Sequence, residues 1–182
     1  MIEMPKYAAF LRAINVAGRR ITGDELCSHF PALGFHDVAA FRASGNVVFA
    51  AESEPLATLT RIEQGLATAL GYEVVAFLRT AKEVRAIAEQ EVFKPAHVQA
   101  SAGKLQVALL LSRPKPRVQE DVLALATDDD RLAFGARELY WLPSGGVLES
   151  SLDQKAIAKL LGPMTFRTKG TIEPIAKKYF VR

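Results

Sequence analysis

The sequence predicts an α+β protein in which one order of strands and helices occurs twice. In residues 1–92, short apolar segments typical of strands and longer segments with helical periodicity follow the order β-α-β-β-α-β. Residues 103–182 repeat this order and add a C-terminal helix. The order is that of the ferredoxin-like fold, or α-β plait, with an antiparallel sheet. We therefore expect two ferredoxin-like units, 1–92 and 103–182, which share the order of their elements and few of their residues.

Local signals place the elements of the first half. Thr22-Gly23-Asp24-Glu25 is a capping box, in which the threonine hydroxyl and the glutamate side chain bond free amides at the start of a helix. Gly34 can take the left-handed conformation that ends this helix. The expected strands are 6–12, 36–42, 46–51 and 73–79, and the expected helices are 22–33, 55–70 and 80–90.

The second half carries similar signals after a linker. Phe93–Gly103, which contains a proline and ends in a glycine, is expected to join the two halves without regular structure. Ser151-Leu152-Asp153-Gln154 caps a helix that ends at Gly162, and the last helix is expected from Thr171 onward. The expected strands are 105–111, 131–135, 138–142 and 164–168, with a further helix around 118–125.

The composition is that of an ordinary globular protein with a basic C-terminal segment. Of 182 residues, 49% are hydrophobic and 24% are charged, and the net charge is +3. From Lys155 onward, seven lysines and arginines stand against one glutamate. Such a segment favours anionic partners.

Segments for export or membrane insertion are not expected. No apolar run approaches the roughly 18 residues of a membrane helix, and the N-terminus lacks a basic segment followed by an apolar one. The single cysteine, Cys27, excludes an internal disulfide, and beside Leu26 and Phe30 we expect it to be a buried thiol rather than a reactive one. The sequence therefore predicts a cytoplasmic protein of bacterial type.

The strands predict burial on both faces of the sheets. Leu105–Leu111 is apolar throughout and Tyr7–Leu11 nearly so, whereas a sheet with one wet face alternates apolar and polar residues. The second faces are expected to pack against the other half or against a partner subunit. An RNA recognition motif has the same element order but exposes paired aromatics on its strands, which Ser44–Phe49 lacks. This disfavours an RNA-binding sheet.

Polar residues follow the expected strands at one edge of the first sheet. In the ferredoxin-like sheet the ends of strands one and two and the start of strand three share this edge. Arginine offers a planar fork of donors for phosphate or carboxylate, and glycines let backbone amides approach a ligand. We predict an anion site formed by Arg12, Asn15, Gly18, Arg42, Ser44, Gly45 and Asn46. The alternative is that the amides and the hydroxyl bond their own turns while the arginines are solvated.

A secondary basic patch is predicted near the C-terminus, although cations in the last helical turn are also favourable for stability alone. The three histidines lack metal-ligand spacing, and Asp128–Asp130 is expected to be a solvated turn. No nucleophile elbow, phosphate-binding loop or dinucleotide fingerprint is present, so no catalytic residue, cofactor or metal is predicted. The secondary basic patch near the C-terminus comprises Arg167, Lys169, Lys177 and Lys178.

Two motifs resemble a known family. Leu11–Gly18 is similar to the Leu-Arg-Gly-Ile-Asn-Val-Gly-Gly opening of the bacterial family called domain of unknown function 1697, and Ser44–Phe49 matches its second motif. The resemblance continues through Tyr140–Pro143 and Thr165–Thr171. It implies a pair of α-β plaits and no established activity. Two alanines, Ala13 and Ala17, stand where the family has glycine, and Phe166–Thr171 replaces its Arg-Asn-Trp-Asn-Thr segment.

The function predicted from these features is a binding module for an anionic ligand, which could be a nucleotide, a phosphorylated metabolite or a nucleic acid. An enzyme acting on a small anionic metabolite and a protein-interaction scaffold remain alternatives. The ligand, and whether the protein is a monomer or a homodimer, stay open at this point.

Overall fold

The computed structural model describes residues 4–42 and 45–181 and divides the chain into two compact units. Unit 1 comprises Met1–Ala86 with Ile175–Arg182, and unit 2 comprises Ile87–Pro174. The chain crosses between them once within helix α3 (Ala81–Glu89) and once within helix α7 (Lys169–Tyr179). The expected boundaries gave the whole last helix to the second unit, whereas its contacts place the chain from Ile175 onward with the first.

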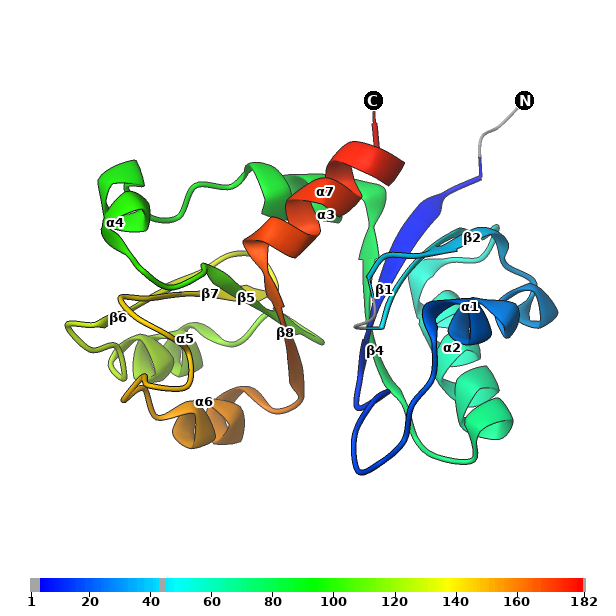
Figure 1. Ribbon diagram of the computed structural model, residues 1–182, viewed down its shortest axis with the longest axis horizontal. Coiled ribbons are helices and arrows are strands. Elements are labelled where there is room, and N and C mark those ends of the chain that lie inside the picture. The colour runs from blue at the N-terminus through cyan, green and yellow to red at the C-terminus, as the bar shows by residue number, and fades with distance from the viewer. Residues whose placement is uncertain (1–3, 43–44, 182) are drawn as a thin grey trace. The chain divides into compact units, whose positions relative to one another are not determined.

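Unit 1 contains the first predicted ferredoxin-like sheet. Its strand order is β2-β3-β1-β4, and every neighbouring pair is antiparallel. Figure 1 shows α1 and α2 together on one face of this sheet. The strands are β1 (Lys6–Arg12), β2 (His36–Ala40), β3 (Asn46–Ala50) and β4 (Val75–Thr80), and the helices are α1 (Gly23–Ser28), the short 3₁₀ helix η1 (Pro31–Leu33) and α2 (Pro55–Leu70).

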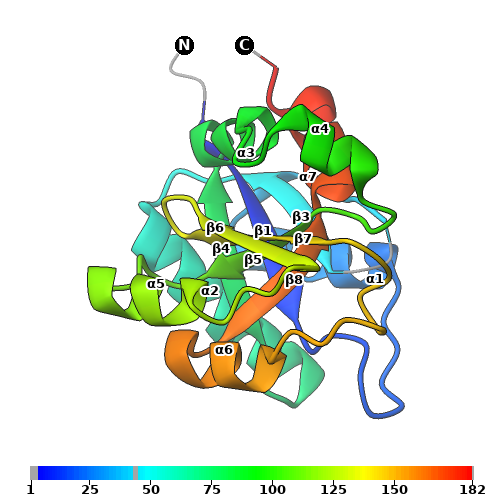
Figure 2. The same cartoon turned by 90° about the vertical axis from the view of Figure 1, so that its left-hand side faces the viewer.

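Unit 2 repeats the same plan. Its sheet has the order β6-β7-β5-β8, again antiparallel throughout. Figure 2 shows α5 and α6 on one side of this sheet and α4 on the other. Its strands are β5 (Gln106–Leu110), β6 (Asp130–Phe134), β7 (Glu138–Pro143) and β8 (Met164–Thr168), and its helices are α4 (Pro95–Ala100), α5 (Pro116–Leu123) and α6 (Gln154–Leu161).

An aromatic cluster forms the centre of the core of unit 1. The ring of Phe49 in β3 lies 4.7 Å from that of Phe35 and 5.4 Å from that of Phe30, measured between centroids. Ile62 and Leu66 of α2 are completely buried in the same core. Aromatic rings at these separations stabilise each other beyond the burial of their area, so α1, η1 and α2 are fixed onto the sheet.

The core of unit 2 includes a buried carboxylate. Asp130, 1% exposed, accepts a hydrogen bond of 2.7 Å from the indole Nε1 of Trp141 and another of 2.7 Å from the hydroxyl of Ser150. The hydroxyl of Thr127 donates to its other oxygen. The expectation that Asp128–Asp130 is a solvated turn is therefore wrong for its last residue, because Asp130 is the first residue of β6 and points into the core.

Most of the expected elements differ by one or two residues at an end, and three of the differences involve a proline. The helix expected at 22–33 ends at Ser28, because Pro31 has no amide to continue the hydrogen-bond ladder, and a 3₁₀ turn follows. Helix α4 occupies the expected linker, where Pro95 is its first residue. The last helix begins at Lys169, two residues earlier than expected, and accommodates Pro174 in its second turn.

The two halves also share residues that the order of elements alone did not reveal. Each fourth strand ends in Arg-Thr directly before a helix, at Arg79-Thr80 and Arg167-Thr168. Both arginines are buried, and each donates to the carbonyl of the preceding residue, at 3.0 Å to Leu78 and 2.8 Å to Phe166. The expectation of little residue similarity between the halves is thus wrong at this position.

The first prediction concerns Gly34. It follows η1 with φ of 79°, in the left-handed region predicted from the sequence. We expect Gly34→Val to lower the free energy of unfolding by about 1–2 kcal/mol, because an L-residue with a branched side chain is strained there. Chemical denaturation measures the change. Gly34→Asn is the control and should cost less, and equal stability of the valine variant and the wild type would contradict the assignment.

Candidate functional site

The sheet register gathers the predicted site at one edge of unit 1. Phe10 pairs with Asn46 across β1 and β3, Arg12 pairs with Val75 across β1 and β4, and Ala40 pairs with Val47 across β2 and β3. Since these pairs are antiparallel, the ends of β1 and β2 and the starts of β3 and β4 share this edge, from which the β1–α1 loop extends (Figure 1). We call its exposed arginines, Arg12, Arg19, Arg20 and Arg42, the basic edge.

The two amides of the predicted site support the loops that carry the arginines. The side-chain oxygen of Asn15 accepts from the amide of Ile21 at 2.8 Å and thereby closes the β1–α1 loop. The side-chain nitrogen of Asn46, which is 2% exposed, donates to the carbonyl of Phe41 at 3.0 Å within the β2–β3 connection. Asn15 and Asn46 therefore position the backbone at this edge, as the alternative reading of the sequence expected.

Left-handed residues are concentrated in the same two connections. Ala13, Ala17 and Gly18 in the β1–α1 loop have φ of 62°, 53° and 80°. Arg42 and Gly45 in the β2–β3 connection have φ of 58° and 70°. Residues in this region are strained unless they are glycine, and such strain is often found at ligand sites. The two alanines therefore hold a conformation that glycine would adopt without strain.

Gly45 is also required by a close approach of two strands. Its carbonyl accepts from the amide of Leu11 at 2.8 Å, and a Cβ at this position would lie 3.3 Å from both the Cβ and the carbonyl oxygen of Leu11. The β2–β3 connection is therefore held directly against the end of β1. Ser44, the remaining residue of the predicted site, lies outside the described residues.

A shallow depression beside the β1–α1 loop extends the basic edge. It has a volume of about 530 Å³, and its lining includes Arg19, Arg20, His29 and Tyr72. The guanidinium of Arg19 lies 4.1 Å from the centre of the Tyr72 ring, and the Tyr72 hydroxyl donates to the carbonyl of Ile14 at 3.2 Å. A guanidinium at this distance is attracted to the face of the ring.

Sequence reasoning did not include Tyr72 in the site, because it lies in the α2–β4 connection and nothing in its neighbourhood marks it. Arg19 and Arg20 follow the first motif directly, and their position there was the only signal that they belong to the edge. The register of β1 with β4 brings the two segments together.

Glu25 supplies a negative charge to the lining of this depression. Its carboxylate accepts from the amide of Thr22 at 2.7 Å and from the Thr22 hydroxyl at 2.9 Å, which completes the predicted capping box. These hydrogen bonds lower the pKa of Glu25 below the usual value of 4.5. The four arginines still outnumber the exposed glutamates of this edge, Glu25 and Glu73.

The side chains at and near this edge differ in the chemistry that they can supply. Within the described part of the chain, no group of histidine, cysteine and acidic residues can hold a metal ion. Burial raises the pKa of the Cys27 thiol, and the nearby Asp24 adds to this effect, so the thiol is mainly protonated at neutral pH. The arginines, by contrast, can donate in pairs to phosphate or carboxylate oxygens.

The four residues of the secondary basic patch differ in how far they are buried. Arg167 is 9% exposed, donates to the hydroxyl of Thr165 at 2.8 Å, and has a pKa that burial lowers to about 10. Arg167 is therefore an internal residue of unit 2 and not part of a basic surface. Lys169 bonds the carbonyl of Gln90 at 2.8 Å. Of the four residues of this patch, only Lys177 and Lys178, in the last turn of α7, are exposed.

Comparison with known proteins bears on the family and on the fold. The profile of the family described as protein of unknown function DUF1697 matches residues 4–140. The chain belongs to this family. In this DUF1697 protein both motifs lie inside the match, whereas the predicted likeness at 165–171 lies beyond it.

A solved structure has the same fold as this DUF1697 protein. It is the conserved bacterial protein SP0830 from Streptococcus pneumoniae, with a TM-score of 0.73 and 20% sequence identity over 96% of this chain and 98% of that one. This likeness establishes the fold alone. No curated protein matches the sequence. None of the helices in the described residues is long and apolar enough to cross a membrane.

The second prediction follows from the left-handed alanines. Replacing Ala13 or Ala17 by glycine should raise the free energy of unfolding by about 0.5–1 kcal/mol, because removing about 1–2 kcal/mol of strain outweighs the greater freedom of glycine in the unfolded chain. Chemical denaturation measures the gain. The control is Ala86→Gly on the exposed face of α3, which should destabilise by about 1 kcal/mol. Destabilisation by both loop substitutions would contradict the conformations.

The third prediction concerns pH. Because the pKa of Glu25 is lowered in the folded protein, its contribution to stability is complete above its unfolded pKa and is lost as the pH falls through the folded value. The melting temperature of Glu25→Gln should therefore lie below that of the wild type at pH 7, and the difference should shrink from pH 5 to pH 3. Glu52→Gln, which removes an exposed carboxyl outside any cap, is the control. A difference that stays constant with pH would contradict this role.

Proposed function

We propose that unit 1 binds an anionic ligand at the basic edge. The observation that carries this proposal is the convergence of Arg12, Arg19, Arg20 and Arg42 on one edge of the sheet, on two connections that touch each other. Within the described residues, Arg12, Arg19 and Arg20 form no ion pair with a carboxylate. Their charge is thus available to a ligand.

The ligand class is one that carries phosphate. Phosphate presents several oxygens to guanidinium donors and is bound by arginine in pairs. The Arg19 guanidinium lies over the Tyr72 ring, and a flat group such as a base could stack beside it. A nucleotide or another phosphorylated metabolite suits the depression of about 530 Å³, and a nucleic acid would follow the line of arginines.

Binding is preferred over catalysis for a chemical reason. The edge supplies charge and hydrogen-bond donors, but an enzyme for a small anionic metabolite would also need a nucleophile or a general base in reach of the ligand. With a single cysteine and therefore no internal disulfide, the chain fits the reducing cytoplasm, where we expect it to act.

The fourth prediction tests this site by ligand-induced stabilisation. We expect a nucleoside triphosphate, pyrophosphate or a short oligonucleotide to raise the melting temperature, since a ligand at a hundred times its Kd adds about 2.7 kcal/mol of stability. Arg19→Ala and Arg12→Ala should each remove most of the shift. Arg113→Ala, which removes an exposed arginine from unit 2, is the matched control and should leave it unchanged.

The salt dependence of the melting-temperature shift distinguishes a nucleic acid from a small ligand. A shift obtained only with oligonucleotides and lost steeply between about 50 and 200 mM salt identifies nucleic acid, because neutralising phosphates releases counterions. A shift with a nucleotide that changes little with salt identifies a small ligand. No shift with any of the three probes, or a shift that survives both arginine substitutions, would overturn the proposal and favour the protein-interaction alternative.

A further inference from the structure

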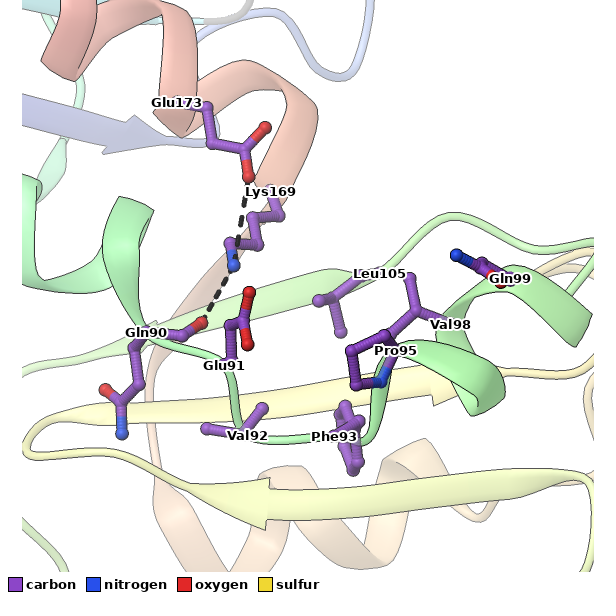
Figure 3. Close-up of a pocket in the computed structure, with 10 residues that line it drawn as sticks. All are labelled: Gln90, Glu91, Val92, Phe93, Pro95, Val98, Gln99, Leu105, Lys169 and Glu173. Carbon is purple, nitrogen blue, oxygen red and sulfur yellow. Dashed lines mark hydrogen bonds and ion pairs between the residues drawn. The ribbon is translucent and has the colours of Figure 1, made fainter.

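Unit 2 contains a cleft that the basic edge does not involve. Its volume is about 360 Å³, at the small end of ligand pockets. Figure 3 shows that it lies among the segment after α3, the start of α4, the residue before β5 and the start of α7. All of its lining residues belong to unit 2, so none is shared with the depression beside Arg19.

One end of the cleft carries charges of both signs. The Nζ of Lys169 donates to the carbonyl of Gln90 at 2.8 Å and lies 3.8 Å from a carboxylate oxygen of Glu173. The lysine side chain is only 15% exposed, whereas that of Glu173 is 52% exposed. Figure 3 shows the carboxylate of Glu91 at the same end. This end therefore presents one ammonium, held in place by a backbone carbonyl, and two carboxylates.

The other end of the cleft is mainly apolar, although Gln99 also lines it. Phe93, Pro95, Val98 and Leu105 face it, and Figure 3 places them opposite the charged end. Pro95 is the first residue of α4, where its fixed φ suits the start of a helix, so this wall is defined by the backbone. Val98 is 39% exposed, so covering it with an apolar group would remove apolar surface from water.

The charges at the first end of the cleft favour a ligand that carries both a carboxylate and an ammonium. A carboxylate without an amine would meet Lys169 but also the like charges of Glu91 and Glu173, and an amine without a carboxylate would meet the like charge of Lys169. A zwitterionic head group places its carboxylate on the lysine and its ammonium on the glutamates. An ammonium has three N–H donors, so Lys169 can keep its bond to Gln90 while it binds the ligand.

We propose that this cleft binds a free α-amino acid with an apolar side chain. The side chain packs against Phe93, Val98 and Leu105, and the head group lies between Lys169 and Glu91. This site is independent of the anion site in unit 1, and its ligand would be recognised by charge pairing at one end and by apolar burial at the other.

Calorimetric titration of the full chain with matched probes tests the proposal. L-leucine and L-phenylalanine are the positive probes. The probe without a carboxylate is 3-methylbutylamine, the one without an amine is 4-methylpentanoate, and glycine lacks the apolar side chain. We expect leucine or phenylalanine to bind at least tenfold more tightly than each of the other three, because each of these leaves one feature of the cleft without its partner.

Variants of the cleft residues test which part of the ligand each residue contacts. Lys169→Met should weaken leucine binding at least tenfold without weakening that of 3-methylbutylamine, since only the first probe has a carboxylate. Val98→Asp, at an exposed position of α4 that leaves the core intact, should abolish binding of leucine and spare the fold. Lys104→Met, which removes an exposed lysine outside the cleft, is the control for charge. Arg19→Ala should leave leucine binding unchanged.

The proposal is overturned by any of three results. If neither amino acid binds at 10 mM, the cleft does not take this class of ligand. If 3-methylbutylamine or 4-methylpentanoate binds as tightly as leucine, the head group is not recognised as a zwitterion. If leucine binding survives Val98→Asp, the ligand lies elsewhere, and none of these results bears on the anion site of unit 1.

Discussion

The structure of unit 1 depends on the position of β1 at the centre of its sheet. β1 is hydrogen-bonded to β3 on one side and to β4 on the other, and both its faces are buried, with Ala9 and Phe10 each 0% exposed. A central strand of this kind cannot shift by one residue, because every side chain would exchange faces. The residue at which β1 ends is therefore fixed, and with it the place where Arg12 and the β1–α1 loop leave the sheet.

The two connections at this edge contain strained backbone, which lowers the stability of the fold but gives the loops a defined shape. Ala13, Ala17 and Arg42 hold left-handed conformations that glycine would adopt without strain, and Asn15 and Asn46 use their side chains to close the loops. The β1–α1 loop thus combines a strained backbone with the charges of Arg12, Arg19 and Arg20. Arg12, Arg19, Arg20 and Arg42 are carried on this backbone, and their side chains are exposed.

The two units have the same strand order but different surfaces. Each has the same strand order and ends its fourth strand in a buried arginine followed by threonine. In unit 1 the edge at the end of the first strand carries an excess of arginine, whereas unit 2 has a cleft with mixed charges and an apolar wall formed by α4. This helix supplies Pro95 and Val98 of the apolar wall, and the other lining residues come from the segments around it.

The sequence by itself determined the order of the strands and of the helices between them, the ends of β1, α2 and β8, and the family. The capping box at Thr22, the left-handed Gly34 and strands β1 and β8 could be predicted because each depends on a few neighbouring residues. Helix α4 was missed because proline and glycine in a short segment indicate a linker as readily as a helix start. Local physical rules thus account for what was foreseen.

Only the tertiary structure decided which polar residues are available to a ligand. Asn46, Asp130 and Arg167 are polar in the sequence and buried in the fold, whereas Tyr72 joins the basic edge from a distant segment. Burial and long-range pairing arise from strands that lie far apart in the chain, and no spacing within one segment records them. The sequence identified the loops that carry the basic edge, and the folded sheet determined which of their side chains face solvent.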